Sequence, residues 1–200
     1  WLKEIRKKRV QILVPERGEK RKLVDISSRN SDLMLGELRL KQAMRKELLT
    51  KPVLQLQEDL GMEVAARRIE AFDNSNIQGN NPVAGMVCFI DGKPQKSEYR
   101  KFHIKSVKGI DDFASMHEVV SRRYKRQLDE KNLLPDLILI DGGKGQLSAA
   151  KSALDALGLG YVPVIGLAKR LEEVFKPGVS EPQNISKTAA GLHLLRKIRD

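Results

Sequence analysis

The sequence predicts an α/β protein with a mixed five-stranded sheet and flanking helices, preceded by a basic, mainly helical N-terminal segment. Three observations lead to this prediction. Strand-like apolar runs at 68–72 and 137–140 are each followed by an aspartate, Asp73 and Asp141, as expected for buried strands that end at one edge of a sheet. Stretches with helical spacing of apolar residues separate the later strand-like runs. The first sixty residues are rich in Lys and Arg but carry little apolar mass.

The excess of positive charge lies in the N-terminal segment. The chain has a net charge of +11, and residues 1–51 hold fifteen Lys or Arg against seven Asp or Glu. Apolar residues recur near a 3.6-residue period, so we expect helix from about residue 22 to residue 60. We place this segment at 1–62 and the folded domain at 63–200. We favour nucleic acid as the polyanion that such a segment binds, the alternative being a solvated charged face that binds nothing.

The first three strands of the domain are predicted to be antiparallel neighbours. The runs at 68–72, 83–90 and 97–104 have strand character, and the last two flank Asp91-Gly92, a strong hairpin signal.

The second half of the domain alternates helices with strands. The predicted elements are a helix at 111–128, a strand at 137–140, a helix at 146–157, a strand at 162–167 and a helix at 190–198. Right-handed crossovers would place the two later strands parallel to the first strand, on its open side. Asp73 and Asp141 would then lie at the same end of the sheet. This is a ribonuclease H-like arrangement.

Two carboxylates on neighbouring strand ends repel each other unless a cation lies between them. A divalent ion held by Asp73 and Asp141, Mg²⁺ or Mn²⁺, would suit phosphoryl transfer. The alternative is that each aspartate is an ordinary turn or N-cap residue, and the spacing alone leaves both interpretations open. Asp112 is a candidate third carboxylate, although for the Asp111-Asp112 pair we favour helix capping.

Basic residues follow or flank the predicted site. Arg122, Arg123 and Arg126 lie on one predicted helix and are candidates for contacts with a phosphate backbone, an exposed helix face being the equal alternative. Lys144 lies in a glycine-rich stretch and Lys169 follows the last strand, so both are further candidates. The glycine-rich stretch lacks the phosphate-loop pattern, which disfavours a nucleotide hydrolase.

Other functional classes find little support. No run approaches 18 apolar residues, so we expect no membrane span. The one cysteine, Cys88, cannot form an internal disulfide, which favours a reducing, cytoplasmic location. No two of His103, His117 and His193 have the spacing of zinc ligands, and we expect ordinary packing or surface roles for them.

Several motifs closely resemble the UvrC family, a component of the bacterial UvrABC excision nuclease, and they occur in the family's order over nearly the whole chain. They lie at 69–79, 98–102, 111–116, 122–124, 139–147, 166–169 and 192–200. The similarity is to the C-terminal half of that protein, with its ribonuclease H-like nuclease domain.

This resemblance implies a function. UvrC cuts damaged DNA on both sides of a lesion, and the domain similar to this chain makes the 5′ incision with a divalent metal. Asp73 and Asp141 match the family's metal-site aspartates, and Asp112 matches a third acidic position. The implied partners are damaged double-stranded DNA and UvrB, the latter through regions missing here. A non-catalytic nucleic-acid binding module on the same fold is the alternative.

The chain also departs from the family pattern. The family's catalytic histidine lies in an Arg-Asp-Glu-x-His-Arg-Phe stretch, of which this chain has the first two residues, Arg199 and Asp200. His193 is a different position. We therefore expect the 200-residue chain to be weakly active or inactive.

Overall fold

The computed structural model describes residues 14–47, 49–75, 83–105, 107, 111–169 and 172–200, with the backbone alone at 38–47 and 75. The chain divides into two compact units, residues 1–48 and 49–200. Of the motif at 69–79, positions 76–79 lie outside the described residues.

The described part of the first unit is centred on a long helix, α2 (Glu19–Glu47). Along the stretch whose side chains are described, apolar residues such as Leu23, Ile26 and Leu33 are exposed among many charged ones. None of the described helices, α2 included, has the length and apolar character needed to cross a membrane.

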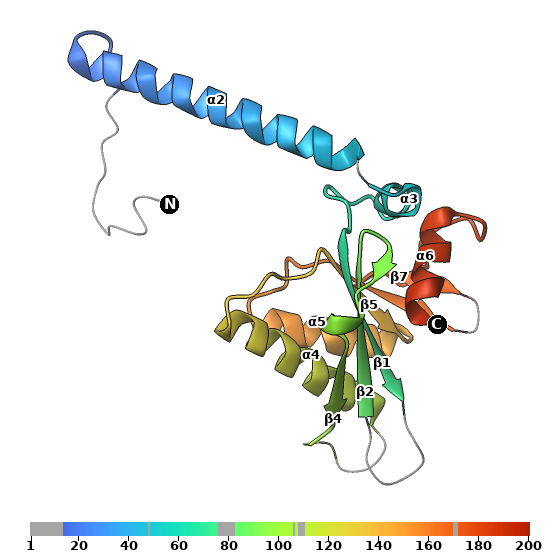
Figure 1. Cartoon of the computed structure of the whole chain (residues 1–200). Helices are drawn as coiled ribbons and strands as arrows, with labels where there is room; N and C mark the ends of the chain where they lie inside the picture. Colours follow the sequence, from blue (N-terminus) through green and yellow to red (C-terminus); the bar gives the residue numbers. More distant parts are fainter. Residues whose placement is uncertain (1–13, 48, 76–82, 106, 108–110, 170–171) are drawn as a thin grey trace. The chain divides into compact units, whose positions relative to one another are not determined.

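The second unit carries the remaining elements (Figure 1). Its helices are α3 (Lys51–Asp59), the 3₁₀ turn η1 (Lys96–Glu98), α4 (Asp112–Asp129), α5 (Lys144–Ala156) and α6 (Ala190–Arg199). Its strands are β1 (Arg68–Ser75), β2 (Val83–Ile90), β3 (Lys93–Pro94), β4 (Arg100–His103), β5 (Leu137–Asp141), β6 (Val164–Ala168) and β7 (Glu173–Phe175).

The strands form one mixed sheet in the order β3-β2-β1-β5-β6-β7, with β4 also paired to β2. Strand β1 lies between antiparallel β2 and parallel β5, and β6 continues the parallel run. This confirms the predicted topology, in which crossovers return the later strands to the open side of the first. The fold is an α/β fold of the ribonuclease H-like type.

The sheet has seven strands where we predicted five. The two additional strands, β3 and β7, have two and three residues, which is too short for a periodic pattern to reveal them. The strand predicted at 97–104 is shorter, because η1 occupies its start and β4 covers only Arg100–His103. Strand β1 runs on to Ser75, because its polar end still pairs with β2.

The hairpin between β2 and β3 turns at the predicted residues. Asp91 and Gly92 both have positive φ angles, 51° and 76°, as the tightest type of hairpin turn requires. The Asp91 carboxylate also accepts two hydrogen bonds of 2.7 Å from the Arg67 guanidinium, so the turn is tied to the residue before β1.

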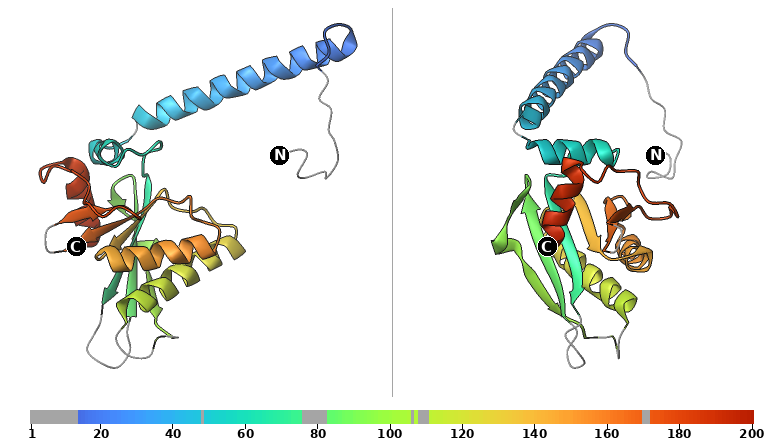
Figure 2. Two further views of the ribbon diagram at one scale, coloured as in Figure 1. Left: turned by 180° about the vertical axis from the view of Figure 1, so that it is seen from behind. Right: turned by 90° about the vertical axis from the view of Figure 1, so that its right-hand side faces the viewer.

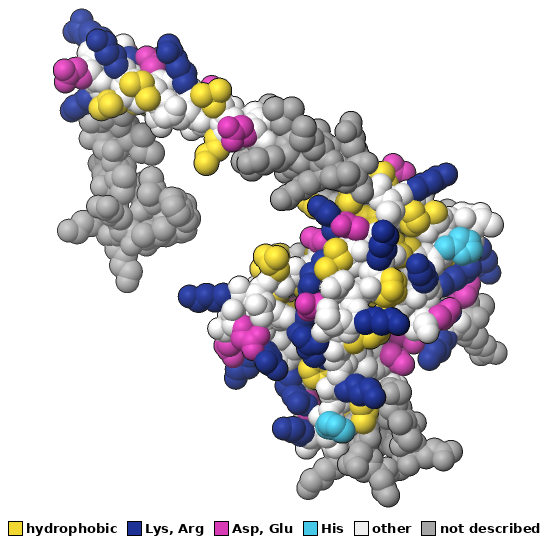
Figure 3. All heavy atoms as spheres, viewed as in Figure 1, with side chains coloured by type: hydrophobic (Ala, Val, Ile, Leu, Met, Phe, Trp, Pro, Cys, Tyr) yellow, Lys and Arg dark blue, Asp and Glu magenta, His cyan; other side chains and the backbone are white. Residues whose placement is uncertain are grey.

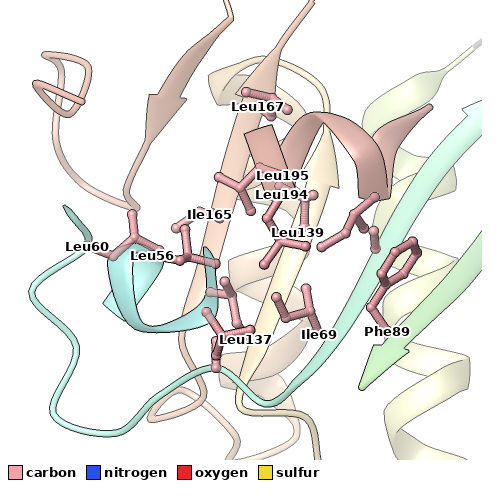
Figure 4. Close-up of a cluster of buried hydrophobic side chains, with 14 of the residues drawn as sticks. Leu56, Leu60, Ile69, Phe89, Leu137, Leu139, Ile165, Leu167, Leu194 and Leu195 are labelled. Carbon is pink, nitrogen blue, oxygen red and sulfur yellow. The ribbon is translucent and has the colours of Figure 1, made fainter. Parts of the chain in front are cut away.

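Each face of the sheet has its own apolar core. Side chains alternate along a strand, so Ile69 and Ala71 of β1 pack in the cluster under α3 and α6, while Phe72 packs in the cluster under α4 and α5. Figure 4 shows the first cluster, with Leu56 of α3 and Leu195 of α6 among its members. In Figure 2, α4 and α5 run side by side, away from α6.

Helix α3 belongs to the core of the second unit. Val53 and Leu56 are fully buried in the cluster under α6, although the sequence analysis grouped them with the basic segment. Close contact with α6 depends on Gly191, because a Cβ atom there would lie 2.8 Å from the Leu56 Cα and 2.9 Å from its nitrogen. The two helices therefore meet backbone to backbone.

Candidate functional site

The two predicted aspartates occupy neighbouring positions on the central parallel strands. Phe72 of β1 is level with Ile140 of β5, and Asp73 and Asp141 are the next residue on each strand. Alternation along the strands turns both carboxylates to the face of Ile69, which α3 and α6 cover. The structure therefore brings together the two residues that the sequence pattern singled out.

The Asp141 carboxylate is buried and only partly paired. Its side chain is 6% exposed, and its Oδ2 atom lies 3.3 Å from the Lys169 Nζ atom. Its Oδ1 atom is buried with no hydrogen-bond partner among the described residues. Burial raises the pKa of Asp141, the Lys169 ammonium opposes that rise, and the negative charge of Asp73 adds to it. The net pKa lies above the ordinary value for an aspartate.

These features fit a cation-binding site. Lys169 already places a positive charge against Asp141, and the unpaired Oδ1 atom leaves room for a further ligand bond. Hard divalent ions such as Mg²⁺ prefer carboxylate oxygens. Within the described ranges, no three Asp, Glu, His or Cys side chains lie close enough together to hold a metal. Asp73 and Asp141 would therefore supply only part of a coordination shell.

The last helix forms one wall of the site. The positive charge of Arg199 in α6 acts on Asp141 and opposes the rise of its pKa. Glu172, just before β7, forms ion pairs with Arg196 and with Arg199, the latter at 3.8 Å. These contacts tie the end of α6 to the strand that follows the site. His193 of the same helix is exposed.

The backbone after Asp141 passes close to β6. The Gly142 N–H donates to the Leu167 carbonyl at 3.1 Å, and a Cβ atom on Gly166 would lie 3.1 Å from the Gly142 carbonyl oxygen. This tight passage leads into α5, whose first residue is Lys144. The Lys144 ammonium lies 4.9 Å from the centroid of the Phe175 ring, in a cation–π contact.

The Asp111-Asp112 pair divides its roles. Asp111 caps α4, because its carboxylate accepts hydrogen bonds from the Phe113 and Ala114 N–H groups at 3.0 and 2.9 Å. Asp112 is the first helical residue, and its carbonyl oxygen accepts a 2.9 Å hydrogen bond from the Asn74 side chain. Because Asn74 follows Asp73, the start of α4 lies beside the candidate site.

Two of the predicted DNA contacts are surface residues of α4 that already have partners. Arg122 pairs with Glu118 at 3.0 Å and donates to the His103 carbonyl at 2.7 Å. Arg126 pairs with Glu130 at 2.6 Å, and its side chain is 73% exposed. Both guanidinium groups are therefore accessible, although neither is beside Asp141.

Arg123 is not on the exposed face where we placed it. Its side chain is 7% exposed and donates two hydrogen bonds, of 2.8 and 3.1 Å, to the buried Glu70 carboxylate. Arg68 and the Tyr124 hydroxyl also donate to Glu70. The sequence analysis missed this network, for which the signal was a glutamate inside an otherwise apolar strand. Such a residue needs a buried partner.

Comparison with known proteins identifies the family. A family model described as the UvrC RNAse H endonuclease domain matches residues 57–200. The chain belongs to the UvrC family. A second family model, the UvrC ribonuclease H-like domain, matches residues 1–38.

Curated relatives named UvrABC system protein C agree with this assignment. The chain is 49% identical over 194 residues to that of Flavobacterium johnsoniae and 47% identical over 190 residues to that of Porphyromonas gingivalis W83. These matches cover 96% and 94% of the chain but 32% of each relative. The chain thus spans about a third of the length of the UvrC relatives that it matches.

Two solved structures of endonuclease V are also similar. One is the Ciona intestinalis enzyme in complex with a 24mer DNA containing an inosine followed by a ribo-adenosine. It has 20% identity and a TM-score of 0.40, over 75% of this chain and 63% of that one. The other is the catalytic domain of the human enzyme, with 18% identity and a TM-score of 0.37, over 69% and 59% of the two chains.

Proposed function

We propose that this chain is a metal-dependent DNA endonuclease domain of nucleotide excision repair, which makes the incision on the 5′ side of a lesion. The observation that supports it most directly is the pair of neighbouring carboxylates, Asp73 and Asp141, with a buried Asp141 oxygen left unpaired. Membership of the UvrC family supports the nuclease class.

The residues of the site have separate tasks in this proposal. A bound Mg²⁺ or Mn²⁺ supplies Lewis acidity for hydrolysis of a phosphodiester. Asp73 and Asp141 would hold that ion at the end of the parallel strands. Lys169, freed from Asp141, pairs with a phosphate oxygen and positions the scissile bond. Asp112 is the third acidic residue, at the start of the helix that Asn74 joins to β1.

The substrate and partners follow from the same proposal. The DNA backbone runs over basic side chains, for which we propose Lys144 and Lys169 near the site and Arg122 and Arg126 further along α4. The substrate is damaged double-stranded DNA, and UvrB is the protein partner. Cys88 is buried and unpaired, which suits the reducing cytoplasm where we place the protein.

Calorimetric titration with Mn²⁺ tests the proposal on the 200-residue chain. The parent should bind one ion at the site, and Asp73→Asn and Asp141→Asn should each abolish that binding, because the pair acts as one site. Asp111→Asn is the matched control, since asparagine caps a helix as well as aspartate does. Its titration should match that of the parent.

Two results would count against the nuclease function. Mn²⁺ binding that persists in both variants would place the ion elsewhere. DNA binding that weakens with salt but is indifferent to Mn²⁺, together with no Mn²⁺ binding by the parent, would favour a non-catalytic nucleic-acid binding module on the same fold.

A further inference from the structure

A pocket opens between α4 and β4, on the face of the sheet opposite the two aspartates. Its volume is about 360 Å³. The residues that line it are Arg68, Glu98, Arg100, Phe102, Arg122, Arg123, Arg126, Gln127, Glu130, Asn132 and Leu133. Five of these eleven side chains are guanidinium groups. Figure 3 shows Lys and Arg side chains gathered over the side of the molecule where α4 and β4 lie.

The floor of the pocket is a fixed array of charges. Glu70 is fully buried behind it and accepts hydrogen bonds of 2.8 Å from both Arg68 and Arg123. Tyr124 adds a third donor at 3.1 Å. Burial alone would raise the pKa of Glu70, but the two guanidinium groups bring it below the ordinary value, so the carboxylate stays ionised. The floor arginines are thereby held in place.

The rim of the pocket keeps positive charge to spare. Arg100 of β4 is exposed and donates to the backbone carbonyls of Ser97 and Tyr99, both at 2.8 Å. It has no ion-pair partner among the described residues. On the opposite wall, Arg126 pairs with the exposed Glu130, a bond that solvent screens. An anion entering the pocket therefore meets guanidinium groups from both walls.

Three of the sequence motifs that resemble the UvrC family meet at this pocket. They are the motifs at 69–79, 98–102 and 122–124, which contribute Glu70, Arg100 and Arg122 among others. The last two motifs contain neither of the candidate metal ligands, so the proposed chemistry leaves them unexplained.

We propose that this pocket binds a backbone phosphate of the DNA strand, as an anchor remote from the cleavage site. Arginine suits such a site, because its planar fork matches phosphate oxygens. Helix α4 starts at Asp112, beside the aspartates, and rises about 1.5 Å per residue. Arg126 therefore lies about 21 Å along the helix, a span of roughly six phosphates at 3.4 Å each. The proposal rests on the proposed nuclease function and adds a second contact point for its substrate.

A paired-variant experiment separates this pocket from general surface charge. Arg100→Gln with Arg126→Gln removes one exposed guanidinium from each wall and leaves the buried floor intact. Lys101→Gln with Lys125→Gln is the matched control, because these exposed residues are the sequence neighbours of the first two and do not line the pocket. Both double variants lose the same charge.

Binding of a fluorescein-labelled 30-base-pair duplex by the 200-residue chain is measured by anisotropy between 50 and 200 mM NaCl. The pocket variant should bind about tenfold more weakly at 50 mM, and its slope of log K against log salt should fall by about one. The control should stay within threefold of the parent. Equal losses in the two double variants, or no loss in the pocket variant, would overturn the proposal.

The result is independent of the metal site. Mn²⁺ titration of the pocket variant should match that of the parent. If Asp73→Asn and Asp141→Asn leave Mn²⁺ binding intact while the pocket variant loses DNA affinity, the anchor stands and the nuclease function falls. If the two aspartate variants lose Mn²⁺ but the pocket variant binds DNA normally, the anchor alone falls.

Discussion

Substitution of Glu70 by glutamine should destabilise the fold more than any surface change. Glu70 is the only carboxylate that contacts both Arg68 and Arg123 among the described residues, and it is fully buried. Glutamine keeps the size but removes the negative charge, which leaves two largely buried guanidinium groups without a counter-ion. Loss of one partner from such a pair costs about 3 to 5 kcal/mol. For a chain of this size that is a fall in Tm of roughly 6 to 20 °C.

Urea unfolding followed by far-UV circular dichroism measures this difference. At pH 7 Glu70→Gln should lose about 3 to 5 kcal/mol of unfolding free energy. The Arg123 and Arg68 contacts hold the pKa of Glu70 below its ordinary value of 4.5. Its ionised form therefore stabilises the fold above that pH, and the stabilisation is lost as pH falls through the lower, folded-state pKa. The gap between variant and parent should accordingly narrow in acid.

Glu98→Gln is the control for this prediction. Glu98 also pairs with Arg68, at 3.1 Å, but its side chain is 36% exposed. A solvent-screened pair of this kind contributes less than about 1 kcal/mol. If Glu70→Gln were no more destabilising than Glu98→Gln at pH 7, or if the gap persisted unchanged in acid, the assigned role of the buried charge would be refuted.

Three further predictions concern the site and its supports. Asp141→Asn should raise Tm at pH 7 in metal-free buffer, since a raised pKa means stability that is lost as pH rises; a lower Tm would contradict this. Lys169→Met should raise the pKa of Asp141 further in a carboxyl NMR titration, because the ammonium at 3.3 Å opposes the rise; an unchanged pKa would show that the ion pair is absent in solution. Gly191→Ala should cost about 1 to 3 kcal/mol in urea unfolding by pushing α6 off Leu56. Gly36→Ala, with nothing within 4 Å of the added carbon, should be neutral or stabilising.

The fold was largely predictable because its central strands carry strong local signals. Strand β2 occupies the predicted range 83–90, bounded by a turn whose residues require positive φ. The long apolar run that became β5 could only be a buried strand. Strands β3 and β7 escaped prediction, because two or three residues become strand only through the partner that they meet.

The candidate site was predictable as far as topology reaches. Asp73 and Asp141 come together because parallel strands carry their carboxyl ends to the same edge. The burial of Arg123 was not predictable from its helix, where it reads as one more basic residue. Its partner, Glu70, is 53 positions away in the sequence, and only the folded sheet brings the two into contact.

The short outer strands also govern how copies of this chain meet. Within the described residues, the sheet is bordered by β3 and β4 on one side and β7 on the other, with two, four and three residues. An open edge of that length offers few unpaired N–H and C=O groups to a neighbouring molecule, and β3 consists of a lysine and a proline. Such borders discourage sheet-to-sheet aggregation. The long strands, which are rich in apolar residues, are enclosed by these borders and cannot template a fibre while the fold persists.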